Sequence, residues 1–262
     1  MSRAITGVGE WANSKVNISQ GCANDCRYCY AREIAVRYRR KTTENWHIEL
    51  IDERKAGAGY GFRKGVVMFP TTHDITPGTV HECCRVLRRL ADAGNRILIV
   101  SKPRPGCMGR VFDTLRGHRE RVEFRFTIGA LDDSILGYWE PNAPKYFERR
   151  RCLMIAKAQG FKTSVSIEPM LDAPHIDDLI SELEIDVTGT IWVGKMNQIG
   201  RRVDTPNTVF HRHMVNNIVC GQVDSEIKAI YERHHRNPKL RWKDSIKRVV
   251  KLPLATKAGE DK

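Results

Sequence analysis

Apolar residues along the chain form two kinds of pattern, which alternate from residue 66 onward. Short apolar or alternating runs predict strands, whereas apolar residues three and four positions apart predict helices that bury one face. Strands that alternate with helices in this way are typical of parallel βαβ units joined by right-handed crossovers. The predicted strands cover 66–69, 96–102, 122–128, 162–167 and 190–195, and the predicted helices cover 77–93, about 109–115, 146–159 and 175–183.

The chain before residue 66 supplies a first strand-and-helix unit and an insertion. We expect the N-terminal residues, including Trp11 and Ala12, to pack against the sheet. The four glycines between residues 57 and 65 match no phosphate-cradling motif, so they predict no nucleotide site. The predicted order is an extended lead-in (1–15), a strand through Val16 and Ile18, a helix (31–41) and an irregular insertion (42–65).

Beyond residue 200 the alternation of strands and helices stops. A long apolar stripe predicts one helix over 209–235, and a basic amphipathic segment follows it up to Lys251. The residues after Pro253 are expected to form a disordered tail. The sequence therefore predicts a domain at 1–200 and a basic, helical extension at 201–262 that packs on it.

Trp242 lies among lysines and arginines in this extension, and two interpretations of it remain open. The basic residues could hold a nucleic-acid backbone while the indole stacks on a base. Alternatively, Trp242, Ile246 and Val250 form one apolar stripe that docks on the domain. Their spacing of four residues favours docking.

Composition and charge narrow the class of protein. The chain has 262 residues, 41% of them hydrophobic, and no apolar run approaches the roughly 18 residues that span a bilayer. The N-terminus lacks the hydrophobic region of a signal peptide, so we expect a cytoplasmic protein with no membrane association. The formal charge of +13 favours an anionic partner, with nucleic acid the leading candidate, although a basic solvated surface would give the same charge.

Cys22, Cys26 and Cys29 form a CxxxCxxC pattern between the first predicted strand and helix. Four cysteines normally hold a cubane iron–sulfur cluster, so three in one turn leave one iron free to bind something else. A zinc site would pair one CxxC with a second distant pair, and the sequence contains no such partner. A disulfide framework is disfavoured because the chain is long and has no secretory signal.

The cysteine stretch resembles the radical S-adenosylmethionine (radical SAM) superfamily. Of the two architectures open to six strand-and-helix units, a doubly wound sheet or a partial barrel, the resemblance implies the second. This is an α/β partial (β/α)6 TIM-type barrel. It also implies a 4Fe–4S cluster on the three cysteines and SAM on the open iron. Electron transfer, from a donor such as flavodoxin or ferredoxin, would cleave SAM to methionine and a 5′-deoxyadenosyl radical.

Other segments resemble the spore photoproduct lyase-like branch of this superfamily. They are Cys-Arg-Tyr-Cys-Tyr-Ala, Ile-Val-Ser-Lys-Pro, Thr-Ile-Gly-Ala-Leu-Asp-Asp, the Glu-Pro-Asn-Ala-Pro stretch from Glu140, and Gly-Phe-Lys-Thr-Ser-Val-Ser-Ile-Glu-Pro-Met-Leu. Together they span roughly residues 10–198. The chain lacks a Gly-Gly-Glu stretch after its second strand and carries Thr71-Thr72-His73-Asp74 there instead.

The resemblance implies roles for residues at the strand ends, where barrels of this kind carry their chemistry. Thr72, His73 and Asp74 would receive the SAM amino group, although His73 fits a packed strand end equally well. Ser101 and Lys102 would face the ribose or the carboxylate of SAM, and Tyr28 would lie near its adenine. Ser166 and Glu168 would lie across the barrel, with ordinary strand packing as the alternative for Ser166.

Spore photoproduct lyase uses a cysteine as hydrogen donor, and Cys107 is the candidate for that role here. An isolated cysteine is, however, commonly a small buried hydrophobe. The sequence lacks a cysteine-rich C-terminal extension, so we expect a single cluster. The predicted function is a radical SAM enzyme that abstracts hydrogen from DNA or a nucleotide. The alternatives are a small-metabolite substrate and a non-catalytic metal-containing module that binds nucleic acid.

Overall fold

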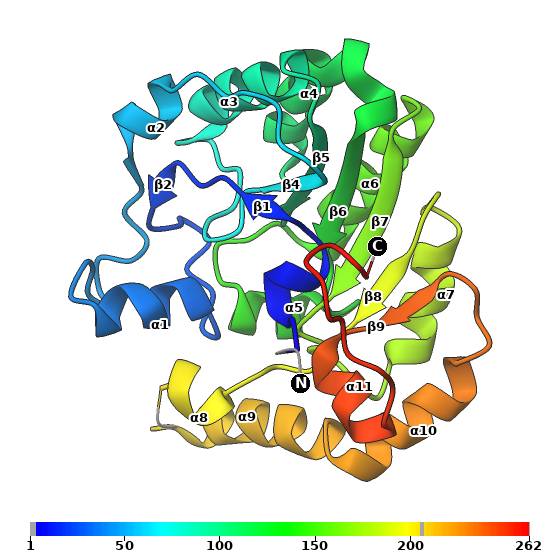
Figure 1. Cartoon of the computed structure of the whole chain (residues 1–262). Coiled ribbons are helices and arrows are strands. Elements are labelled where there is room, and N and C mark those ends of the chain that lie inside the picture. The colour runs from blue at the N-terminus through cyan, green and yellow to red at the C-terminus, as the bar shows by residue number, and fades with distance from the viewer. Residues whose placement is uncertain (1–3, 205–206, 262) are drawn as a thin grey trace.

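The core of the protein is one curved, parallel sheet in a computed structural model that describes residues 4–204 and 207–261 (Figure 1). Within those residues no pairing joins its two end strands, so the sheet is a partial barrel. This confirms the predicted fold class. In spatial order the seven strands are β1 (Ser14–Lys15), β4 (Val66–Phe69), β5 (Arg96–Ser101), β6 (Val122–Thr127), β7 (Lys162–Ile167), β8 (Ile191–Val193) and β9 (Leu240–Trp242).

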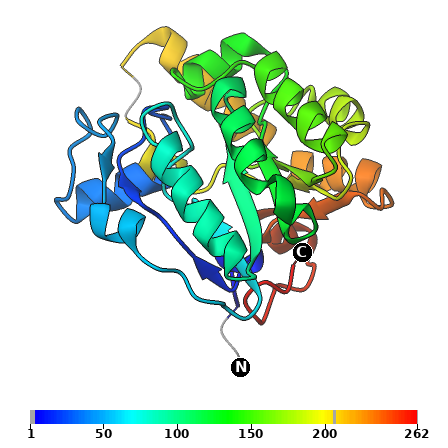
Figure 2. The same cartoon turned by 90° about the horizontal axis from the view of Figure 1, so that it is seen from above.

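Both faces of this sheet are buried. In β4, Val67 and Phe69 belong to the large apolar core formed with the helices between the strands. Val66 and Met68 instead join a smaller cluster inside the barrel. Continuous apolar strands are the expected consequence, because each face contacts protein. The helices on the outer face are α3 (Val80–Asp92), α4 (Pro105–Leu115), α6 (Tyr146–Ala158) and α7 (Ile176–Glu184) (Figure 2).

The N-terminal segment enters the barrel interior. Trp11 is 5% exposed and its ring lies 5.5 Å from that of Trp192, edge to face. The Arg125 guanidinium lies 4.6 Å from the Trp11 ring and 5.1 Å from the Trp192 ring. The expectation that Trp11 and Ala12 pack against the sheet is therefore confirmed.

The first predicted strand-and-helix unit contains two short strands in place of one. The expected strand through residues 16 and 18 is replaced by β1 and by β2 (Ser19–Gln20), which pairs antiparallel with β3 (Leu50–Ile51). Ile18 N donates to the His73 ring, so the chain leaves the main sheet there. The remaining helices are η1 (Gly7–Glu10), α1 (Tyr30–Arg37), α2 (Glu53–Gly57), η2 (Arg116–Arg121), α5 (Asp133–Trp139), α8 (Ile199–Arg202), α9 (Val209–Gly221), α10 (Asp224–His234) and α11 (Asp244–Val250).

The prediction of one helix over 209–235 is wrong, because α9 and α10 are separate. The junction contains Gln222, which is buried. Its side-chain oxygen accepts from Met196 N at 2.7 Å, and its side-chain nitrogen donates to Met170 O at 2.7 Å. These two bonds satisfy barrel backbone groups and interrupt the helix.

The basic segment of the extension is also not one helix. Leu240–Trp242 forms β9, which pairs parallel with β8 and adds a seventh strand to the barrel. Leu240 and Trp242 are buried while Arg241 is exposed, which is the two-residue period of a strand. Trp242 is 7% exposed and belongs to the main core, so this indole packs against the barrel and is not free to stack on a base, although it does so from a strand and not from the predicted helical stripe.

The C-terminal tail lies along the N-terminal segment, contrary to the expected disorder. Gly259 N donates to Gly9 O at 2.8 Å, and Asp261 N donates to Glu10 O at 3.1 Å. The Lys247 ammonium lies 2.5 Å from the Asp261 carboxylate. A terminus that is tied down by such bonds is ordered. None of the helices in the described part of the chain has the length and apolar character needed to span a membrane.

Candidate active site

A cavity of about 310 Å³ lies where the strands end, beside the cysteine loop. Its walls come from that loop, from the ends of β4 to β8 and from the C-terminal extension. The structure brings together there nearly all residues that the sequence singled out. They are Cys22, Cys26, Tyr28, Cys29, Thr72, His73, Asp74, Lys102, Ser166 and Glu168.

The three cysteine thiols of the loop line this cavity. Cys29 caps the N-terminus of α1, where its sulfur accepts from Arg32 N–H at 3.4 Å. Burial raises the pKa of all three thiols, so they are neutral until a metal displaces the proton. All eight cysteines are free thiols. In residues 4–204 and 207–261, no three His, Cys, Asp or Glu side chains already form a ligand group for a metal ion.

Gly21 shapes the start of this loop. Its φ of +93° lies in the region that favours glycine. A Cβ atom at this position would lie 2.2 Å from Ile48 O and 2.8 Å from Trp46 O. Trp46 O also accepts from Cys22 N at 3.0 Å, so the same backbone contact places the first cysteine.

We expect Gly21→Ala to destabilise the fold by about 1–3 kcal/mol, because both the dihedral angle and the backbone contact oppose a side chain. It should also lower the iron content after reconstitution. Urea unfolding and iron analysis measure the two effects. Gly109→Ala in α4 is the control, since a Cβ there meets open space and alanine favours a helix. Equal behaviour of the two variants would contradict the role of Gly21.

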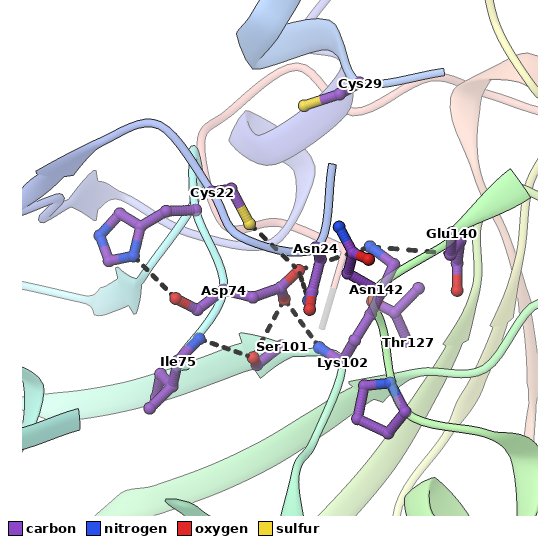
Figure 3. A network of polar contacts seen from close by, with 12 residues as sticks. Cys22, Asn24, Cys29, Asp74, Ile75, Ser101, Lys102, Thr127, Glu140 and Asn142 are labelled. Atoms are coloured by element: carbon purple, nitrogen blue, oxygen red, sulfur yellow. Dashed lines mark hydrogen bonds and ion pairs between the residues drawn. The ribbon is translucent and has the colours of Figure 1, made fainter. Parts of the chain in front are cut away.

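Asp74 is the centre of a buried polar network (Figure 3). Its carboxylate accepts from Asn24 Nδ2 at 2.9 Å, Ser101 Oγ at 3.0 Å and Lys102 N at 2.7 Å. The Cys22 thiol also donates to it, at 3.9 Å. Burial alone would raise the pKa of Asp74, but the Lys102 ammonium and these hydrogen bonds lower it below its ordinary value. Asp74 is therefore an ionised, oriented acceptor in the cavity wall.

Ser101 differs from its expected role. The sequence places it facing the ribose or carboxylate of SAM, but it does not line the cavity. Its hydroxyl donates to Asp74 and accepts from Ile75 N at 3.1 Å. Ser101 thus orients Asp74 from behind, because its side chain is buried by the turn after β4.

The predicted elements also leave Cys107 in the loop between the strand at 96–102 and the helix at about 109–115, and this prediction is wrong. Cys107 lies in α4, is 3% exposed and packs in the main core. It is not among the residues that line the cavity. The structure therefore contradicts the idea that Cys107 donates hydrogen there and supports the alternative of a buried hydrophobe.

The His73 ring stabilises the turn after β4 by hydrogen bonds to backbone groups. Its Nε2 accepts from Ile18 N at 3.2 Å, and its Nδ1 lies 3.0 Å from Asp74 O, to which it donates. Burial lowers the pKa of this imidazole, so the ring is neutral. Both nitrogens are occupied by backbone groups, which favours the packed strand-end interpretation.

The sequence assigned no role to Glu140. The structure shows that its carboxylate is the second one, after that of Asp74, to lie near the Lys102 ammonium. Glu140 accepts a hydrogen bond from the Tyr28 hydroxyl and lies 3.9 Å from Lys102 Nζ. Its second oxygen lies 2.5 Å from Arg149, and neither side chain has any exposed surface. Burial and Glu140 raise the pKa of Tyr28 well above its usual value, so this phenol stays neutral. A sequence signal for Glu140 was present, because Glu140 begins a segment that resembles the spore photoproduct lyase-like branch.

Glu168 contacts the C-terminal extension. Lys243, which follows β9 and is fully buried, lies 3.6 Å from Glu168 and 3.0 Å from Glu10. Its ammonium also donates to Gly7 O at 2.9 Å. Burial raises the pKa of Glu10 to about 7 and also raises that of Glu168. No local motif pointed to Lys243, since its partners come from distant parts of the chain.

The fold is a parallel α/β partial barrel in which the strand ends and the three-cysteine loop share one cavity. The family model "Radical SAM superfamily" matches residues 16–183, so the chain belongs to this superfamily. Radical SAM enzymes use a 4Fe–4S cluster and SAM. This family assignment contradicts the alternative of a non-catalytic metal-containing module.

Known structures share the fold. SuiB from Streptococcus suis bound to S-adenosylmethionine aligns with a TM-score of 0.56 at 8% identity, over 94% of this chain and 54% of SuiB. A spore photoproduct lyase variant with dinucleoside spore photoproduct aligns with a TM-score of 0.56 at 13% identity, over 92% of this chain and 78% of the lyase.

Uncharacterized protein ORF301 of Acidianus two-tailed virus is similar in sequence. The two are 26% identical over 188 residues, which are 67% of this chain. The chain spans only 61% of the length of that viral protein.

Proposed function

We propose that Cys22, Cys26 and Cys29 hold the single 4Fe–4S cluster of this radical SAM enzyme and that SAM binds in the same cavity. The observation that carries this is that three thiols from one loop, two of them buried and that of Cys29 half-buried, line a cavity together with Asp74 and Lys102. Soft thiolates suit iron–sulfur clusters, so the residues fit the group. When bound, the cluster and SAM supply hydrogen abstraction through reductive cleavage of SAM.

The surrounding residues bind and orient SAM in this proposal. The ionised Asp74 accepts from the SAM ammonium, and Thr72 offers a second oxygen acceptor beside it. Lys102 attracts the SAM carboxylate. Burial lowers the pKa of Lys102, but Asp74 and other nearby groups raise it well above its usual value, so it stays charged.

The remaining strand ends complete the cavity in the proposal. Tyr28 is held by Glu140, with Lys102 Nζ 5.7 Å from the centre of its ring, and it lies along the adenine of SAM. Ser166 and Glu168 face the ribose or the substrate from the opposite strand. A partly buried carboxylate such as Glu168 needs hydrogen-bonding partners, which hydroxyl groups provide.

DNA or a nucleotide is the proposed substrate. The formal charge of +13 and the resemblance to the spore photoproduct lyase-like branch support it. A small metabolite remains the alternative, and binding of DNA that weakens with salt would distinguish the two. A flavodoxin or ferredoxin is the proposed electron donor. An oxygen-sensitive cluster needs a reducing compartment, so the cytoplasm is the proposed location.

The test is anaerobic reconstitution with iron and sulfide, followed by reduction with dithionite in the presence of SAM. Chromatography should then detect 5′-deoxyadenosine, in larger amount when a DNA substrate is present. A fully loaded cluster that yields none, with or without candidate substrates, would contradict the proposal. Retention of zinc in place of iron would also contradict it.

A further inference from the structure

The described residues that line the cavity carry more positive than negative charge. Lys102, Lys195, Arg202 and Lys243 face two carboxylates, Asp74 and Glu168. This leaves a formal excess of two positive charges. Such an excess attracts an anion into a cavity with low-dielectric walls.

Two of the four cations, Lys102 and Lys243, already have close carboxylate partners. Lys102 lies 3.6 Å from Asp74 and 3.9 Å from Glu140. Lys243 lies 3.0 Å from Glu10 and 3.6 Å from Glu168. Glu10 and Glu140 lie outside the lining and offset its formal excess, so what distinguishes Lys195 and Arg202, at the C-terminal side of the cavity, is that neither has a buried carboxylate partner.

Lys195 follows β8, and its nearest carboxylate is 3.8 Å away on Asp224, a residue with 71% of its side chain exposed. Water screens such a pair, so it contributes little. The Lys195 backbone is fixed, because its N–H donates to Ser245 Oγ at 3.0 Å.

Arg202 forms no ion pair within the described part of the chain. Its side chain lines the cavity from α8, and its Nε is buried without a hydrogen-bond partner. The guanidinium carbon lies 5.8 Å from the centre of the Tyr30 ring. Burial lowers the pKa of Arg202, and the nearby carboxylates of Glu33 and Glu168 only partly oppose this. A buried donor with no acceptor is costly unless a ligand supplies one.

The position of Arg202 is set by neighbouring elements. Helix α8 lies beside α1, the helix that follows the cysteine loop (Figure 1). Arg202 O accepts from Arg32 Nη2 at 3.5 Å, and the adjacent Arg201 lies 2.9 Å from Glu33 on α1. The guanidinium of Arg202 is thus presented to the cavity while that of Arg201 is tied to the surface.

We propose that Arg202, assisted by Lys195, binds a phosphate group of an oligonucleotide substrate. This rests on the proposed function and specifies which side of the cavity receives the substrate. The planar guanidinium offers two parallel donors that match phosphate oxygens, and it is less strongly hydrated than an ammonium. Lys102 on the opposite side is left to the cofactor carboxylate, so the two anions occupy separate cations.

The experiment measures calorimetric binding of a dinucleotide to the reconstituted, unreduced protein with SAM bound. One dinucleotide has its natural phosphodiester, and the other carries an uncharged methylphosphonate linkage. The wild type should prefer the charged linkage. Arg202→Met should weaken binding of the phosphodiester about tenfold and reduce the preference to the part that Lys195 supplies, as expected for a lost charge-assisted hydrogen bond. Arg202→Lys should be intermediate, since it keeps the charge but not the fork.

Arg201→Met is the matched control, because that side chain is half exposed and pairs with Glu33 outside the cavity. It should bind both dinucleotides as the wild type does. If Arg202→Met also behaves as the wild type, the phosphate subsite is wrong while the proposed enzyme activity stands. If Arg202→Met weakens SAM binding and not dinucleotide binding, Arg202 serves the cofactor and the inference is again overturned.

If the wild type binds neither dinucleotide, one further titration tests the anion subsite separately from the nucleic-acid substrate. Inorganic pyrophosphate is then titrated as a minimal anion. Binding that is lost in Arg202→Met would support the anion subsite and contradict the nucleic-acid substrate. Failure of pyrophosphate to bind as well would overturn both the subsite and the nucleic-acid substrate, although 5′-deoxyadenosine formation could still support the radical SAM chemistry.

Discussion

Cys26→Ala is expected to reduce 5′-deoxyadenosine formation to background and to lower the iron content of the reconstituted protein. Cys26 is 6% exposed and lines the cavity with the other two cysteines of the loop. Its removal leaves only two thiolates for a cluster that already lacks a fourth protein ligand. Replacing residues that merely support metal ligands changes affinity or activity about 10–100-fold, so losing a ligand should exceed that range. Iron analysis and chromatography of the reaction products measure the two effects.

Cys220→Ala is the matched control for this prediction. Cys220 is an exposed free thiol on α9 and does not line the cavity. Its replacement should leave iron content and product formation unchanged. Full activity of Cys26→Ala would show that the cluster ligands lie elsewhere, and loss of activity in both variants would indicate a general effect of removing thiols.

Arg149→Met is expected to lower the free energy of unfolding by about 3–5 kcal/mol, the usual cost of breaking a buried ion pair. The Arg149 guanidinium lies 2.5 Å from Glu140 and also donates to Pro144 O at 2.6 Å. Its loss leaves one oxygen of a fully buried carboxylate without its cation. Urea unfolding of the wild type and the variant at neutral pH measures the difference.

The neighbouring residue offers the control. Arg150 pairs with Glu182 and Asp186, but 28% of its side chain is exposed. Water screens these pairs, so Arg150→Met should cost only about 1 kcal/mol or less. The double variant Glu140→Gln, Arg149→Met should recover part of the loss, because the unpaired buried charge is removed. Similar unfolding free energies for the Arg149 and Arg150 variants would contradict the buried-pair argument.

Local features of the sequence were enough for the parallel α/β class and for most of the cavity, whereas the partial barrel was chosen over a doubly wound sheet by the family resemblance. The strands β4 to β8 were predictable because β4, β5 and β8 are apolar runs and β6 and β7 alternate apolar and polar residues, patterns set by residues adjacent in the chain. Parallel strands with right-handed crossovers bring their carboxyl ends to one edge. For this reason Asp74, Lys102 and Glu168 could be placed beside the cysteines without knowing any contact.

The extension was harder to predict because its pattern is ambiguous at short range. Leu240 and Trp242 fit both a two-residue strand period and part of an apolar helical stripe. The free edge of β8 decides between them, since its backbone hydrogen bonds become available only after the barrel forms. The break at Gln222 has the same origin, because the groups that this side chain binds belong to the barrel.

The polar partners of the cavity are determined by folding alone. Lys243 and Arg202 carry no motif, the resemblance of the segment from Glu140 gives that residue no role, and a charged residue in a sequence is most often a solvated surface group. Their burial follows from packing between segments far apart in the chain, as in the pairing of Lys243 with Glu10. The sequence thus reveals features that residues close together in the chain determine, namely the periodicity of strands and helices and the spacing of the three cysteines. The pairing and orientation of buried charges depend on three-dimensional proximity, because electrostatic and hydrogen-bond energies fall steeply with distance.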